Sequence, residues 1–197
     1  MGLLEPTRGQ ILIDGVPLSP NNRAAWQRSV AHVPQSIFLS DTTIARNIAF
    51  GRAPETMRHA DIAEAARLAQ LDEVITALPG GLDTRIGERG IKPSGGQKQR
   101  LGIARGIYKD VPVVLLTRRR AHWTTKTEAA VLGAMRALSA LGKTLVTIAH
   151  RESTLRNCDR IRLLRRDGLC PSRAAGAPSW RCASGFAVPR LEHEDSP

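Results

Sequence analysis

The sequence predicts an α/β fold built on a parallel sheet, because strand-like and helix-like segments alternate along the chain. The apolar run Val111–Leu116 is predicted to be a fully buried strand, and a helix at Lys126–Leu141 precedes another strand at Thr144–Ala149. With 197 residues, 42% of them apolar, the chain is long enough for about one domain with its own core. The composition therefore argues against disorder throughout the chain.

The segments before that strand predict a mixture of short strands and helices. Gly9–Gly15 reads GQILIDG, which places Ile11 and Ile13 on one face of a strand and ends in Asp-Gly, a sequence typical of a turn. A second short strand is expected at Val30–Val33. Residues 56–71 carry apolar side chains at helical spacing, and Leu78-Pro79-Gly80-Gly81 ends that region. A helical subdomain, about residues 52–108, is therefore predicted to interrupt the sheet.

The remaining segments complete the predicted domain and leave a tail. Gln97–Tyr108 is predicted to be a helix that follows a glycine-rich loop, and Asp159–Leu164 is a further candidate strand. Beyond Gly168 the sequence has neither the helical nor the strand period and is rich in Ser, Pro, Ala and Arg. We therefore expect one domain over residues 1–168 and a poorly ordered tail over residues 169–197.

Charge and composition narrow the classes of partner. The chain holds 29 Lys and Arg against 18 Asp and Glu, a net charge of +11, which suggests an anionic partner such as a nucleotide or a nucleic acid. Because no apolar run reaches the 18 or so residues that cross a bilayer, any membrane role has to come through a partner. The cysteines are three in number and not closely paired, which favours neither a disulfide framework nor a zinc site and makes a reducing cytosolic setting the default.

The most informative segment is Lys92–Tyr108, which reads KPSGGQKQRLGIARGIY. Ser94 lies three residues before Gln97 at the head of a predicted helix, which is the capping-box spacing, and Gly95 and Gly96 leave the N–H groups of the first turn bare. Such a helix N-terminus binds anions, because unpaired donors and the positive end of the helix dipole both face the ligand. Taken alone, the three residues Ser-Gly-Gly also fit an ordinary capped helix with a flexible entry loop.

The longer string resembles the signature motif of the ATP-binding cassette (ABC) transporter ATPases. Further segments are similar to this family, in the family's order, over about residues 2 to 168. They are a Q-loop at Val33-Pro34-Gln35, an exporter-like stretch at Asp41–Gly51, the loop at Gly87–Gly90 that exporters place against their membrane domain, and an H-loop at Ile148-Ala149-His150-Arg151. The resemblance implies a P-loop NTPase core of exporter type with a helical signature subdomain.

The resemblance also implies a site, cofactors and partners. In the family, ATP and Mg²⁺ are bound, Gln35 contacts the metal and the attacking water, and His150 contacts the γ phosphate. The signature residues Ser94, Gly95, Gly96 and Gln97 act instead on ATP held by a second nucleotide-binding domain in a head-to-tail dimer. Transmembrane domains of an exporter are the other expected partner, which places the chain in the cytoplasm at the inner face of the membrane, and no nucleic acid is expected.

The first departure from the family is the absence of the phosphate loop G-x-x-x-x-G-K-[ST] from the 197 residues. The start of the chain, Met1–Pro6, is similar to the stretch that follows the helix after that loop. We therefore expect a partial core without its first strand and phosphate-binding loop, the Walker A motif. A sheet with an unfilled position exposes apolar edges, which predicts low solubility and aggregation.

The second departure follows Val113–Leu116, where the family has a Walker B Asp for Mg²⁺, a catalytic Glu that polarises the attacking water, and then a D-loop Asp. The chain has Thr117-Arg118-Arg119-Arg120-Ala121-His122-Trp123-Thr124 instead. The family string Asp-Glu-Ala-Thr-Ser-Ala-Leu-Asp can be encoded gac gag gcg acg agc gca ctg gac, and reading this DNA one base late reproduces the observed residues. We hypothesise a one-base loss and a nearby one-base gain that shift the frame across residues 117–124 only.

The residues at the two altered positions oppose catalysis. Thr117 offers a neutral hydroxyl where Mg²⁺ prefers a carboxylate, and Arg118 places a cation where an anion has to orient water. One pair of unit charges about 4 Å apart at an effective dielectric near 20 is worth about 4 kcal/mol, so reversing the sign is severe. Arg118 is able to hold phosphate, but it cannot act as a base at neutral pH. Thr117 and Arg118 are therefore predicted to be non-functional in catalysis.

Three functions from different classes follow from the sequence. The first is the nucleotide-binding domain of an ABC exporter by descent, truncated or inactivated in this copy, whose family couples ATP hydrolysis to transport. The second is a non-enzymatic partner that lends its signature turn to an intact cassette. The third is a basic nucleic-acid binder, which the net charge of +11 suggests but which lacks the stacking aromatic residues of such proteins.

Overall fold

The computed structural model of the protein describes residues 2–88, 90–117, 124–148 and 158–161, and the backbone of residues 164–165, 168–169 and 173–174. The chain divides into two units, residues 1–148 and 149–197. Gln35, the Ser94–Gln97 turn and Thr117 all belong to the first unit, whereas Arg118 and His150 lie outside the described residues. The predicted domain boundary near residue 168 stays a prediction.

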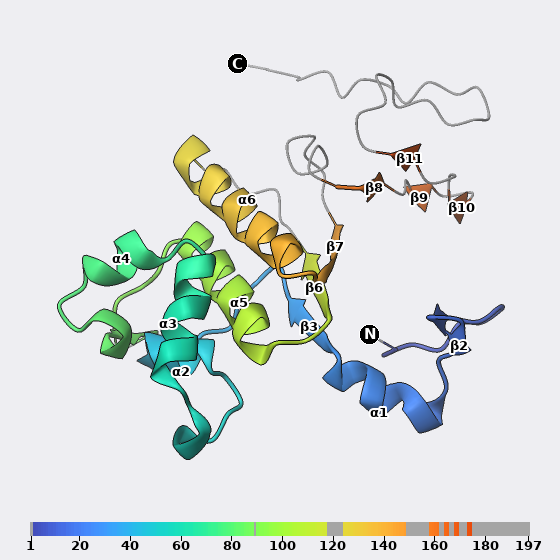
Figure 1. Ribbon diagram of the computed structural model, residues 1–197, viewed down its shortest axis with the longest axis horizontal. Coiled ribbons are helices and arrows are strands. Elements are labelled where there is room, and N and C mark those ends of the chain that lie inside the picture. The colour runs from blue at the N-terminus through green and yellow to red at the C-terminus, as the bar shows by residue number, and fades with distance from the viewer. Residues whose placement is uncertain are drawn as a thin grey trace. The chain divides into compact units, whose positions relative to one another are not determined.

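A three-stranded parallel sheet forms the centre of the first unit (Figure 1). Its strands are β3 (Val30–Val33), β6 (Val113–Thr117) and β7 (Thr144–Ile148), in the order β3-β6-β7. Val33 lies opposite Leu116, and Thr117 lies opposite Ile148. The parallel sheet predicted from the sequence is therefore confirmed, although β6 begins two residues after the predicted Val111, since Pro112 has no N–H to donate to a neighbouring strand.

Two long helices cover one face of this sheet. They are α5 (Gly95–Lys109) and α6 (Thr125–Ala140), close to the predicted Gln97–Tyr108 and Lys126–Leu141. The strand residues on the helix side are buried, and Val114 and Leu116 are at most 1% exposed. On the other face Val146 and Ile148 of β7 are 49% and 59% exposed. Within the described residues, β7 is also an edge strand with one side unpaired.

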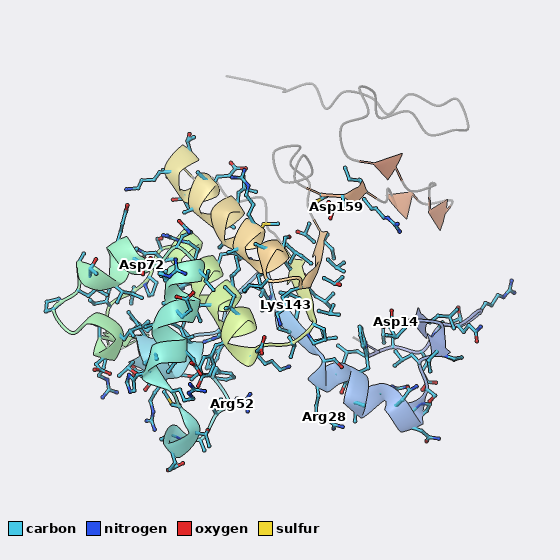
Figure 2. All side chains as sticks on the ribbon, viewed as in Figure 1. Asp14, Arg28, Arg52, Asp72, Lys143 and Asp159 are labelled. Carbon is cyan, nitrogen blue, oxygen red and sulfur yellow. The ribbon has the colours of Figure 1, made fainter. Side chains whose placement is uncertain are left out.

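The amino ends of the strands are tied to the helices by lysine side chains. Lys109, the last residue of α5, donates from Nζ to the Val30 carbonyl of β3 at 2.7 Å. Lys143, labelled in Figure 2, forms a 2.6 Å ion pair between its Nζ and Oδ1 of Asp110, which ends α5 in the left-handed region with φ of 52°. These contacts fix the position of α5 relative to the amino ends of the strands.

The N-terminal segment contains a hairpin and a helix that was not predicted. β1 (Leu12–Ile13) pairs antiparallel with β2 (Val16–Pro17) through Asp14 and Gly15, whose φ angles are 49° and 81°, so the predicted turn is confirmed and the strand is shorter than expected. The helix α1 (Pro20–Arg28) follows Ser19, whose N–H donates to Oδ1 of Asn22 at 2.8 Å. Proline at the first helical position and this asparagine cap start a helix in a stretch for which the sequence analysis predicts no element.

The segment that joins β3 to α5 in the sequence consists of short elements, most of them helical. They are β4 (Thr42–Thr43), α2 (Ile44–Ile48), the 3-10 helix η1 (Pro54–Thr56), α3 (His59–Leu68), α4 (Asp72–Thr76), the 3-10 helix η2 (Gly81–Asp83) and β5 (Arg85–Ile86), with β4 paired to β5. The single helix predicted over residues 56–71 was wrong in its limits. It ends at Leu68 because Gln70 adopts φ of 60° and Leu71 N–H donates to Ala66 O, a Schellman-type stop.

The second unit contains four strands of two residues each among its described residues. β8 (Arg160–Ile161) pairs antiparallel with β11 (Arg173–Ala174), and β9 (Leu164–Arg165) pairs antiparallel with β10 (Gly168–Leu169). The single strand predicted at Asp159–Leu164 is therefore two strands. Apart from the backbone of residues 169 and 173–174, the predicted tail of residues 169–197 lies outside the described residues. None of the helices described in either unit combines the length and apolar character needed to cross a bilayer.

Candidate functional site

The predicted anion-binding turn lies at the N-terminus of α5. Ser94 is the N-cap, its Oγ accepts the Gln97 N–H at 3.3 Å, and the Gln97 side-chain oxygen accepts the Ser94 N–H at 2.8 Å. The predicted capping box is therefore confirmed. Ser94 and Gly95 are exposed to solvent, so the Gly95 N–H at the start of the first turn is accessible to a ligand, whereas the Gln97 N–H is bonded to Ser94.

The turn packs closely against α6 at Gly96. Gly96 is buried where α5 meets the start of α6, and a Cβ at this position would overlap Cγ2 of Thr127. Thr127 is itself held by the N-cap of α6, because its N–H donates to Oγ1 of Thr124 at 3.3 Å. Only glycine allows the two helix N-termini to approach this closely.

Gln35 and Thr117 follow neighbouring strands to the same edge of the sheet. Gln35 is exposed, two residues beyond the end of β3 at Val33, and Thr117 is the last residue of β6. Parallel strands bring their carboxyl ends together, which is where α/β proteins place ligands. β7 places Ile148, two residues before His150 in the sequence, opposite Thr117.

In the described residues, the side-chain hydrogen-bonding neighbour of Thr117 is an imidazole. Oγ1 of Thr117 lies 3.5 Å from Nε2 of His32, on the sheet face that the helices do not cover. One hydroxyl and one imidazole are a poor donor set for Mg²⁺, which prefers carboxylate oxygens and water. No cluster of three His, Cys, Asp or Glu side chains able to hold a metal occurs in the part of the chain that the structure describes.

The structure keeps the Gln35 segment and the Ser94–Gln97 turn apart but supports both on α5. Gly102 lies against the residues on either side of Gln35, since a Cβ there would come within 2.6 Å of Ile37 Cδ1 and 2.9 Å of Val33 Cγ1. Six residues separate Gly102 from Gly96, which is about 9 Å along a helix axis. The two predicted sites are therefore neighbours on one rigid element and do not form one pocket.

Arg105 and Asn47 are site-supporting residues that the sequence analysis did not single out. Arg105 extends from α5 and donates to the Phe38 carbonyl, the Asn47 carbonyl and the Asn47 side chain. Its guanidinium also lies 4.9 Å from the centroid of the Phe50 ring, and Phe38 meets Phe50 edge to face at 6.3 Å. Burial lowers the pKa of Arg105, although a guanidinium stays protonated in proteins.

The sequence profile of the ABC transporter family matches residues 1–116, which is more than half of the 197-residue chain. The chain belongs to the ABC transporter family. Within this ABC chain, α5 carries the string that resembles the signature motif of the family, and the residues after β3 carry the string that resembles its Q-loop. The roles predicted for Gln35 and for the Ser94–Gln97 turn in nucleotide binding stay predictions.

Relatives of known structure and sequence place the chain among ABC exporters. A bacterial Atm1-family ABC exporter with ATP bound has a TM-score of 0.75 and 37% identity, over 87% of this chain and 30% of that chain. An ATP-dependent lipid A-core flippase of Cupriavidus metallidurans is 42% identical over 161 residues, 81% of this chain and 27% of the flippase. The uncharacterized ABC transporter ATP-binding protein YwjA of Bacillus subtilis is 39% identical over 165 residues, 84% of this chain and 28% of that protein.

These comparisons confirm the predicted family, its exporter type and the partial P-loop NTPase fold. The chain spans less than a third of the length of these relatives, whose shares are 27%, 28% and 30%. His150, predicted to be the H-loop histidine, and Arg118, at the predicted position of the catalytic Glu, lie outside the described residues, as does Arg89 of the loop predicted to face a membrane domain.

Proposed function

We propose that this chain descends from the nucleotide-binding domain of an ABC exporter and lacks ATPase activity of its own. Its remaining function is to present the Ser94–Gln97 turn to ATP that a second, intact cassette holds. The transmembrane domains of an exporter are the further partner of such an assembly, at the cytoplasmic face of the membrane. In this proposal the chain contributes binding and not a catalytic base.

The observation that supports this proposal most strongly is the exposed and well-formed turn at the N-terminus of α5. Its capping box is complete, and close packing at Gly96 fixes its position against α6. An anion at this place meets free N–H groups and the positive end of a 15-residue helix. A phosphate group approaching from another subunit needs only this surface of the chain.

The residues at the end of β6 support the second part of the proposal, the loss of hydrolysis. Among the residues that the structure describes, His32 is the side-chain hydrogen-bonding neighbour of Thr117, and neither group supplies the negative charge that Mg²⁺ requires. The sequence continues into Arg118, whose positive charge replaces an acidic residue of the family. A metal ion therefore does not fit at Thr117, and we assign no catalytic step to one.

Capture by an intact cassette tests the binding function. Immobilised full-length flippase of C. metallidurans in detergent should retain the purified chain with ATP and release it without ATP. Ser94→Asp should abolish the retention, because aspartate still caps the helix but its carboxylate repels the phosphates. Thr43→Asp is the matched control, since Thr43 caps α2 by accepting the Arg46 N–H at 3.2 Å.

The capture experiment contradicts the binding function if retention is independent of ATP. It also contradicts this function if Ser94→Asp and Thr43→Asp weaken retention equally, because the signature turn then has no special role. Circular dichroism of each variant shows whether its helices are retained.

The purified chain should show no ATP turnover above the buffer rate in a phosphate-release assay. The reason is the missing negative charge at residues 117 and 118, where the family polarises the attacking water. Turnover that disappears in the Arg118→Ala variant would overturn this prediction, because it would assign the activity to this site.

A further inference from the structure

The guanidinium of Arg105 binds three neutral acceptors from segments distant in sequence. Its Nη1 donates to the Phe38 carbonyl at 2.7 Å, its Nε to the Asn47 carbonyl at 2.6 Å, and its Nη2 to Asn47 Oδ1 at 2.9 Å. Desolvation lowers the pKa of this half-buried group, so its burial has a free-energy cost. The fork of N–H groups therefore links α5 to the segment after Gln35 and to α2 at once.

Asn47 extends the same network to the rest of that segment. It is 0% exposed, and its Nδ2 donates to the carbonyls of Ser40 and Thr43, each at 3.0 Å. Its Oδ1 accepts the Ser40 N–H at 3.0 Å as well as the Arg105 contact. Every hydrogen-bonding position of the amide is thus used, and the backbone from Phe38 to Thr43 is held at both ends.

Steric contact holds the opposite side of Gln35. Val33 and Ile37 pack against the bare Cα of Gly102, one turn before Arg105 on α5. Val33 is 1% exposed and Ile37 is 8% exposed, whereas Gln35 between them is exposed. Gln35 therefore sits at the tip of a short loop, residues 34–36, with both of its ends fixed on the same helix.

From these contacts we infer that Arg105 is a positioning residue for Gln35, acting through the Phe38 carbonyl and Asn47. It sets where the Q-loop stands relative to the helix whose N-terminus is the signature turn. The assignment of a nucleotide-related role to Gln35 rests on the proposed function. The positioning itself belongs to the nucleotide-free chain, so it can be tested separately.

The geometry requires arginine and not merely a positive charge. Three donors on one planar group reach three acceptors at fixed angles, whereas the single ammonium of lysine meets one of them well. Arg100 offers a matched comparison on the same helix. Its Nη1 donates to the Gln70 carbonyl, and desolvation also lowers its pKa, but its contact is with the end of α3 and not with the Q-loop.

A spin label at residue 35 tests the inference in the full chain. Cys158, Cys170 and Cys182 are replaced by serine, and Gln35→Cys is labelled and measured without nucleotide. The label should become more mobile in Arg105→Met, less so in Arg105→Lys, and should be unchanged in Arg100→Met. Amide exchange at Ser40, whose N–H donates to Asn47, should accelerate about tenfold in Arg105→Met only.

Two outcomes overturn the inference. One is an unchanged label in both Arg105 variants, and the other is equal mobility gained in Arg105→Met and Arg100→Met, which would show a general loss of stability. If circular dichroism shows that Arg105→Met does not fold, the label mobility in Arg105→Lys is the deciding measurement, because lysine keeps the positive charge and the aliphatic part of the side chain. A positive label result with failed ATP-dependent capture would reject the proposed function and leave the positioning role standing.

Discussion

Gly102 and Gly133 both lie inside long helices, but their surroundings differ. Alanine normally stabilises a helix interior by up to about 1 kcal/mol relative to glycine. At Gly133 the added Cβ would meet only the flexible Gln70 side chain, 3.4 Å away, so the ordinary gain remains available. At Gly102 it would meet buried Val33 and Ile37 at less than 3.0 Å, with no room for either to move.

Gly102→Ala should therefore lower the free energy of unfolding by about 1–3 kcal/mol, the usual cost of overpacking. Gly133→Ala should leave it unchanged or raise it by up to about 1 kcal/mol. Urea denaturation followed by circular dichroism compares the two variants with the parent chain. A higher midpoint for Gly102→Ala than for the parent would contradict the packing described around the Q-loop.

The two kinds of site residue differ in how far the sequence could predict them. Ser94 and Gln97 are three residues apart, so their capping box is a local pattern and could be recognised in the string SGGQ. Arg105 and Asn47 are 58 residues apart in sequence, and no local spacing signals their hydrogen bonds. Arg105 lies in the string that resembles the signature motif, but its hydrogen-bonding partner Asn47 is identified only from the packing of α2 against α5 in the structure.

The helix α6 begins at Thr125, and its N-cap Thr124 provides a prediction about the altered window. Thr124→Asp should raise the free energy of unfolding by about 0.3–1 kcal/mol, since a carboxylate both caps the helix and complements its dipole. Aspartate is also the family residue implied by the frame hypothesis. Thermal denaturation at low salt measures the change, and Ser139→Asp in the last turn should have the opposite sign. Equal effects at both ends would exclude the dipole as the cause.

Long periodic elements were predicted well, and short ones were not. β3 has the predicted limits, and α5 and α6 differ from their predictions by one or two residues, because their apolar residues face one covered side of the sheet. The helix α2 was missed because four of its five residues are buried, which removes any amphipathic pattern. Two-residue strands such as β8 lack enough residues to display a period at all.

Among the described residues, one face of the sheet is uncovered and the edge of β7 is unpaired, and we expect both features to affect how the chain behaves in solution. Parallel strands are normally buried on both faces, and an unpaired apolar edge is a site for pairing with other chains. Val146 of β7 is 49% exposed, and Leu141 at the end of α6 is 46% exposed, so the two are matched in exposure but not in location.

Val146→Lys should reduce aggregation of the purified chain several-fold, because a lysine charge in the middle of β7 opposes stacking and edge pairing between copies of the chain. Leu141→Lys should have little effect, although it removes a similarly exposed apolar side chain. Light scattering at increasing protein concentration compares the two. An equal improvement in both variants would mean that general surface polarity, and not the strand, controls association.

The pairing of β3 with β6 also has a consequence for the order of folding. β3 ends at Val33 and β6 begins at Val113, so the entire helical layer lies between two strands that share hydrogen bonds. Closing so long a loop is costly in chain entropy and slow, whereas the contacts within α2, α3 and α5 are more local. During synthesis from the N-terminus, α5 is therefore made before β6, the strand that pairs with β3. We expect the residues after β3 to pack against α5 before the hydrogen bonds between β3 and β6 form.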